Sequence, residues 1–108
     1  MQTPAPGNLT AIGTAVLDGG AVAEVVIDEF TSCFARLHTD GAWSGWVLVA
    51  EGVRDASATA YPGHDEPSAL IAVVVLVPLP PGVHAVSHTL HQDRFFRLTA
   101  GGITSAGL

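Results

Sequence analysis

The longest apolar stretch of this chain is Ala69–Val77, with the sequence ALIAVVVLV, and the turn residues of Pro78–Gly82 follow it. It is rich in β-branched residues and shorter than the ~20 residues that a membrane-spanning helix requires. A short apolar run bounded by turn residues is typical of a strand that is buried on both faces of its sheet. We therefore expect a core strand here, within a small β domain.

Other segments alternate between apolar and polar residues, which is the pattern of a strand with one buried face. Ala21–Phe30 alternates in this way, with the acids Glu24 and Asp28 on one face and Ala23, Val25 and Ile27 on the other. A helix over Ala21–Leu37 is the alternative, but the β-branched content and the nearby glycines favour strands. Ser32–Thr39 alternates as well, and Asp40-Gly41 predicts a tight turn after it. Ser32–Thr39 and Trp43–Glu51 should therefore form a hairpin.

Further strands are expected on either side of this hairpin. They are Thr10–Leu17, which ends at the turn signal Asp18-Gly19-Gly20, then Ala56–Tyr61, Val83–Leu90 and Arg94–Thr99, the last two separated by a turn at His91-Gln92-Asp93. About seven or eight short strands between turn residues predict an all-β fold, as a single antiparallel β-sandwich, a jelly roll or a small barrel. We expect an extended N-terminal arm at residues 1–8, the β domain at residues 9–100, and a flexible or extended tail at residues 101–108.

Composition narrows the classes of partner. The 108 residues have room for one domain, and a single cysteine, Cys33, excludes an internal disulfide framework. Charged residues make up 13% of the chain, against roughly 25% in an ordinary soluble domain. With so few charged residues, part of the surface is expected to be covered by further copies of the chain or by a partner, and we therefore expect a homo-oligomer. The net charge of −6 would repel a phosphate backbone, so we expect no nucleic-acid partner. The N-terminal residues lack a signal-peptide pattern, so we expect no secretion by a signal peptide. We also expect no membrane partner.

The histidines are the first candidates for a metal site. His84, His88 and His91 would share one face of a helix and could ligate zinc there, but a strand turns His91 to the opposite face. The segment Pro80–His84 resembles part of the second cupin motif, although its histidine comes one residue early. The His-x-His pair of the first cupin motif has no counterpart. We therefore expect the histidines to lie on the surface or at a subunit contact.

Other reactive groups are equally poorly arranged. Ser87, His88 and Asp93 contain the elements of a hydrolase triad, but no nucleophile-elbow pattern surrounds them. The acid pairs Asp28-Glu29 and Asp65-Glu66 could bind calcium, or they could be solvated turn acids. We expect no enzyme activity, no catalytic residue, no cofactor and no metal site. A metal-dependent small-barrel enzyme remains the third hypothesis.

The aromatic residues are the candidate binding groups. Trp43, Trp46, Tyr61 and Phe34 could form an exposed platform for a sugar or a peptide. In a continuous strand Trp43 and Trp46 would point to opposite faces, so one is expected in the core and the other at an interface; Phe95 and Phe96 should diverge in the same way. An aromatic side chain without room in the core often anchors an interface. The expected interface residues are Pro4, Pro6, Trp43, Trp46 and Phe96.

Three features together resemble a known class of proteins: the Pro/Gly-containing arm, the segment GTAVLDGGAVAEVVID (residues 13–28), and a late apolar strand closed by PLPPG. They resemble small β-sandwich structural proteins of tailed phages, those of actinobacterial hosts in particular, which include capsid decoration (cement) proteins and small tail proteins. The resemblance implies a non-enzymatic virion component, as a trimer on a capsid or tail lattice, with residues 1–8 against a neighbour. A capsid decoration protein is the leading hypothesis. The alternatives are a tail component or a carbohydrate- or host-surface-binding module that uses Trp43 or Trp46 with Tyr61.

Overall fold

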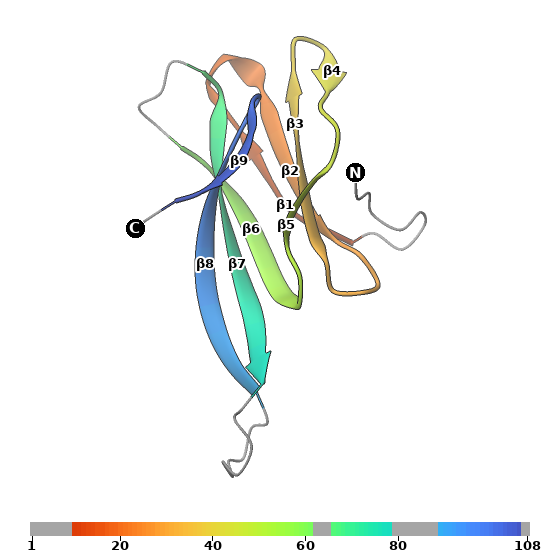
Figure 1. The fold of residues 1–108 in the computed structure, drawn as a ribbon. Coiled ribbons are helices and arrows are strands. Elements are labelled where there is room, and N and C mark those ends of the chain that lie inside the picture. Colours follow the sequence, from red (N-terminus) through yellow and green to blue (C-terminus); the bar gives the residue numbers. More distant parts are fainter. Residues whose placement is uncertain (1–9, 62–65, 79–88, 107–108) are drawn as a thin grey trace.

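The computed structural model describes residues 10–61, 66–78 and 89–106, and it consists of two antiparallel sheets packed on each other (Figure 1). The first sheet contains β1 (Thr10–Val16), β2 (Val22–Ile27), β3 (Cys33–Thr39), β4 (Ala42–Trp43) and β5 (Val47–Ala50), and the second contains β6 (Val53–Ala60), β7 (Ser68–Pro78), β8 (Thr89–Thr99) and β9 (Gly102–Ser105). Strand order is β1-β2-β3-β4 in the first sheet, where β5 also pairs with β3, and β6-β7-β8-β9 in the second. The expected all-β sandwich is confirmed.

Short turns join the neighbouring strands. The 3-10 turn η1 (Asp18–Gly20) links β1 to β2. Asp40 and Gly41 link β3 to β4 with φ angles of 52° and 81°, and Thr39 pairs with Ala42 across them. Two positive φ angles in a two-residue loop define the type I′ turn, whose twist matches that of the flanking strands. The predicted hairpin is therefore present.

The core lies between the inner faces of the two sheets. In the first sheet, Ala23, Val25 and Ala35 have no exposed surface, and Ile71 in the second sheet has none either. Small and β-branched side chains dominate this layer. It explains why the chain alternates so regularly, since each strand sends every second residue into the same core. Val26 and Phe34 lie on the opposite face of the first sheet, outside this cluster, yet each is only 3% exposed.

The apolar run in β7 is buried on one face only. Ala69, Ile71, Val73 and Val75 are each at most 4% exposed, whereas the residues between them are half-buried. The prediction of burial on both faces was therefore wrong for the residues whose side chains are described. Sheet pairing on both sides, from β6 and β8, shields these outward residues partly without a covering layer.

Three further expectations change at the level of elements. The turn expected at His91-Gln92-Asp93 is absent, because these residues lie inside β8 and pair with β7. Trp43–Glu51 is two short strands, β4 and β5, rather than one. Residues 102–105 of the expected tail form β9 on the edge of the second sheet. The expected arm at residues 1–8 and most of the strand expected at Val83–Leu90 lie outside the described residues.

The backbones of the two sheets lie close together at Gly13 of β1. A Cβ atom built there would lie 3.1 Å from the backbone nitrogen of Ala58 and 3.2 Å from Cα of Ser57, both in β6. The register of β1 against β2 also shifts between Ala11 and Gly13. Glycine is thus required by a close backbone contact between two edge strands.

The hairpin of β7 and β8 is longer than the rest of the sandwich. The two strands pair from Ser68 and Thr99 as far as Pro78 and Thr89, while β6 accompanies β7 only as far as Val75. Figure 1 shows the paired strands running past the ends of their neighbours. No helix in the described part of the chain is long and apolar enough to cross a membrane.

Candidate interaction surfaces

Two tryptophans and one arginine form a cluster on the outer face of the first sheet. The guanidinium carbon of Arg36, in β3, lies 4.0 Å from the ring centroid of Trp43 and 4.4 Å from that of Trp46. The His38 ring stands 5.0 Å from Trp43, centroid to centroid, with the planes tilted by 60°. We call Arg36, His38, Trp43 and Trp46 the tryptophan–arginine cluster. Stacking of a cation on aromatic rings contributes about 0.5–2 kcal/mol per pair.

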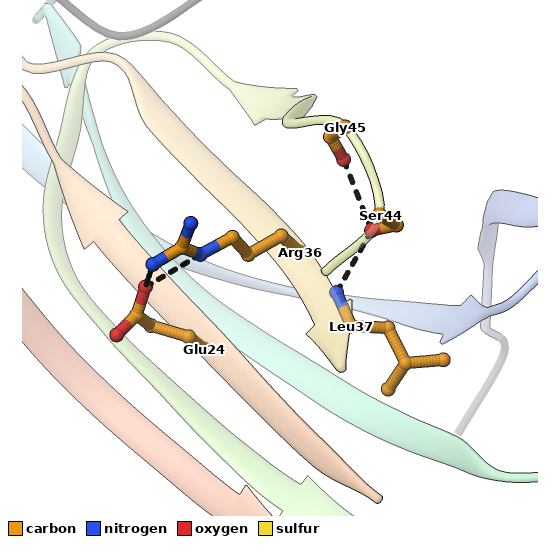
Figure 2. Close-up of polar contacts among 5 residues, drawn as sticks. All are labelled: Glu24, Arg36, Leu37, Ser44 and Gly45. Atoms are coloured by element: carbon orange, nitrogen blue, oxygen red, sulfur yellow. Dashed lines mark hydrogen bonds and ion pairs between the residues drawn. The ribbon is translucent and has the colours of Figure 1, made fainter. Parts of the chain in front are cut away.

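An ion pair with the neighbouring strand holds the arginine in place. Arg36 donates from Nε and from Nη2 to Oε1 of Glu24 in β2, both at 2.8 Å (Figure 2). Glu24 and Arg36 face each other directly in the ladder between β2 and β3. Their side chains keep 20% and 28% of their surface exposed, so the pair is only partly screened by water. Glu24 thus balances the charge of Arg36 and orients its guanidinium beneath the tryptophan rings.

Ser44 explains why both tryptophans reach the same arginine. Its backbone N–H donates to the carbonyl of Leu37 at 2.7 Å, and its Oγ accepts the Leu37 N–H at 2.9 Å. Figure 2 shows the hydroxyl between Leu37 and the carbonyl of Gly45, to which it donates at 3.1 Å. The side chain thus replaces a ladder carbonyl where β4 ends. The strand alternation is interrupted there, so Trp46 is free to turn toward Arg36.

The aromatic platform expected from the sequence is not assembled. Trp43 and Trp46 do not diverge, because the strand is broken between them. Phe34 is 3% exposed and offers no surface. Tyr61 follows β6 in the other sheet, where Arg97 stacks on its ring at 4.6 Å and donates from Nη2 to its hydroxyl at 3.1 Å. Arginine thus covers a face of each remaining ring, and only Trp43, at 42% exposed, keeps a large free area.

The turn between β2 and β3 presents a second aromatic group that the sequence reading did not single out. Phe30 is 70% exposed at this turn. Asp28, only 9% exposed, accepts the backbone N–H groups of Phe30 and Ser32 on Oδ1 at 2.9 and 3.0 Å. Thr31 has a φ of 61°, which is strained for a β-branched residue. We call residues 28–32 the Phe30 turn.

The Phe30 turn is also tied to the second sheet. The carbonyl of Thr31 accepts the N–H of Val53, the first residue of β6, at 2.8 Å. The backbone N–H of Asp28 donates to the backbone carbonyl of Ser32 at 3.0 Å, and the backbone N–H of Thr31 donates to the backbone carbonyl of Asp28 at 3.2 Å. These bonds hold the backbone of the turn in a strained conformation, and the phenyl ring that this backbone carries is exposed to solvent. The sequence signal was an aspartate two residues before the aromatic, in the position of an Asx turn.

The other expected contact residues are distributed as follows. Phe95 and Phe96 diverge as predicted: Phe96 packs against the core, whereas Phe95 stands opposite Ala72 on the outer face of the second sheet. The outward position thus belongs to Phe95, not to Phe96. Pro4 and Pro6 lie outside the described residues.

The described part of the chain does not bring the candidate metal-binding and catalytic residues together. His84, Ser87, His88 and Asp65 lie outside the described residues, and His91 is placed only by its backbone in β8. Asp28 uses its carboxylate to hold the Phe30 turn. Among the described residues, no group of three histidine, cysteine or acidic side chains could hold a metal ion. A hollow of about 460 Å³ lies between the turns at Asp18–Ala21 and His38–Gly41.

Cys33 is a core residue. It has no exposed surface, and burial raises the pKa of its thiol from 9.0 to about 12. The physical cause is the loss of water around the thiolate, which favours the neutral form. A thiol in this environment is unreactive at neutral pH. Cys33 therefore acts as a small hydrophobic residue of the core.

The fold and these surfaces define an all-β sandwich with aromatic groups exposed at its surface. Comparison with known protein families, with curated proteins and with solved structures finds no match for the chain.

Proposed function

We propose that this protein is a non-enzymatic structural component of a virion, and most directly a capsid decoration protein that stabilises a capsid lattice. The observation that carries the proposal is Phe30, which is 70% exposed on a turn strained at Thr31 and held by a buried aspartate. Strained backbone persists only where the surrounding structure holds it, and it is concentrated at functional positions. A solvent-exposed aromatic side chain on a backbone held in place by hydrogen bonds is the kind of group that anchors an interface.

The low charge of the chain supports the same role. With only 13% charged residues, the surface carries fewer charges than an isolated soluble domain usually does, which favours partial coverage by a partner. Trp43 is a further large apolar side chain, with 42% of its surface exposed. Even small apolar contacts, at about 25 cal/mol per Å², reinforce a shell when many copies repeat them. The proposed partners are further copies of this chain and a capsid or tail protein, in the virion.

The alternative as a carbohydrate- or host-surface-binding module is less well supported. It requires free aromatic faces, and Arg36 stacks on both tryptophans while Arg97 stacks on Tyr61. A role as a tail component is compatible with the same exposed phenylalanine, because this side chain could bind a tail protein as well as a capsid protein. The neighbouring genes and the composition of the particle separate the two.

The proposal is tested first on the genome that carries this sequence. We expect genes for a major capsid protein or a terminase close to it, and mass spectrometry of the purified particles should detect this chain in many copies per capsid. Detection at a copy number that matches the tail would replace decoration by a tail role. If the neighbouring genes encode metabolic enzymes and the purified particles do not contain this chain, the proposed virion role is contradicted.

A further inference from the structure

The outer face of the second sheet, which looks away from the core, has an apolar centre. Three rows of residues cross it from β6 through β7 to β8: Asp55, Val74 and Asp93; then Ser57, Ala72 and Phe95; then Thr59, Leu70 and Arg97. The β7 members and Phe95 are apolar and half-buried, while the β6 members and Asp93 are exposed. We call these nine residues the outer face. Its middle row lies beside a hollow of about 230 Å³ that Ala72, Val74 and Phe95 help to line.

Charge is distributed unequally along this face. Asp55 and Asp93 flank Val74 at one end, and Arg97 flanks Leu70 at the other. Four residues of strand separate the two ends, which is about 13 Å. Arg97 donates from Nη2 to the Tyr61 hydroxyl at 3.1 Å, and within the described part of the chain its other terminal nitrogen, Nη1, is not used in a hydrogen bond. A guanidinium has five N–H donors, so Arg97 can bind a further carboxylate.

Two symmetric ways exist to place this face on itself. With a two-fold axis parallel to the strands, β6 of one copy lies over β8 of the other, and Asp55 meets Asp93, which is repulsive. With the axis across the strands at the Ala72 row, β8 lies over β8 and Arg97 of each copy meets Asp93 of the other. The second arrangement also places the small Ala72 at the centre, where the sheets can approach to the usual ~10 Å.

We propose that the outer face binds the outer face of a second copy in this second arrangement, with the facing β7 strands antiparallel. The apolar middle row excludes water and the two Arg97–Asp93 pairs fix the direction. The contact is isologous, as in most homodimers. Its nine residues a side are fewer than the roughly 20–30 of a stable complex, so we expect a dissociation constant weaker than ~1 μM.

This dimer contact adds a specific interface to the proposed structural function, and its biological role rests on that function. It uses a different surface from the Phe30 turn. Sedimentation velocity of the full chain, from about 1 μM to about 1 mM, measures it. We expect a monomer at low concentration and a dimer at high concentration. Asp93→Arg should weaken dimerisation by at least ~10-fold, because Arg97 of the partner then meets a like charge. Asp93→Asn should weaken it less, and the exchange Asp93→Arg/Arg97→Asp should restore it.

Asp55→Arg is the matched control, since Asp55 faces Thr59 of the partner in the proposed arrangement and the dimer should persist. Circular dichroism identifies the variants that retain the fold. Equal weakening by Asp55→Arg and Asp93→Arg would overturn the proposed arrangement. A trimer, or a monomer at every concentration, would overturn the pairing itself. Neither result would change the particle binding expected of the Phe30 turn, so the two proposals fail separately.

Discussion

At the scale of single residues, polar side chains accept hydrogen bonds from backbone N–H groups at places where the strand pairing ends. Ser44 substitutes for a ladder carbonyl opposite Leu37, and Asp28 binds two N–H groups of the Phe30 turn. Each substitution of side chain for backbone creates a local shape that alternation alone does not produce. The result is two tryptophans that both pack against Arg36 in the first case and an exposed phenylalanine in the second.

Ser44→Ala should lower the free energy of unfolding by about 1–2 kcal/mol, because the Leu37 N–H loses its acceptor. Urea denaturation followed by tryptophan fluorescence measures both the stability and the environment of Trp43 and Trp46. Ser57→Ala, at an exposed position in β6, is the control and should change stability by less than about 0.5 kcal/mol. Equal effects of the two substitutions would show that the Ser44 hydroxyl does not support the strand break.

The buried thiol of Cys33 makes stability depend on alkaline pH. Its pKa is about 12 in the folded protein and 9.0 ordinarily, so above pH 9 the unfolded chain releases a proton that the folded chain retains. Stability should therefore fall as the pH rises from 9, by about 1.4 kcal/mol at pH 10 from this group. Urea midpoints at pH 8 and pH 10, compared with those of Cys33→Ala, isolate the effect. If both proteins lose the same stability, the thiol is not the cause.

At the scale of elements, alternation and turn residues were sufficient to predict most strands. The β3–β4 turn at Asp40-Gly41 and the strand at Ala69–Val77 follow directly from local sequence. The errors arise where tertiary context decides. His91–Asp93 looks like a turn, but the long pairing with β7 extends the strand through it. The stacking of Trp43 and Trp46 on Arg36 could not be predicted, because it depends on a break that Ser44 stabilises from outside the ladder.

The contact between β1 and β6 should be the least tolerant of added volume. Gly13→Ala places a methyl group about 3.1 Å from the backbone of Ala58, so one strand must shift, and we expect a loss of about 1–2 kcal/mol. Gly101→Ala is the control, since its nearest neighbour is the Thr99 hydroxyl at an ordinary 3.7 Å. Thermal denaturation of both variants is the measurement. An unchanged Gly13→Ala protein would mean that the edge strands separate freely.

At the scale of the whole molecule, the two sheets present different surfaces. The first carries the tryptophan–arginine cluster and the Phe30 turn, and the second carries an apolar face with acids at one end and an arginine at the other. One surface can hold a lattice while the other holds a second copy. A structural protein that links copies and lattice needs two such independent surfaces.

The most direct measurement of the central claim is co-sedimentation with virus particles that lack this protein, purified from a host in which its gene is deleted. We compare the wild type with Phe30→Ser, and with Val16→Ser as a control that removes a side chain 73% exposed elsewhere on the surface. All three proteins should unfold within about 0.5 kcal/mol of each other, because neither side chain is buried. The account predicts that wild type and Val16→Ser pellet with the particles while Phe30→Ser stays in the supernatant. Pelleting of Phe30→Ser at the wild-type level would contradict it.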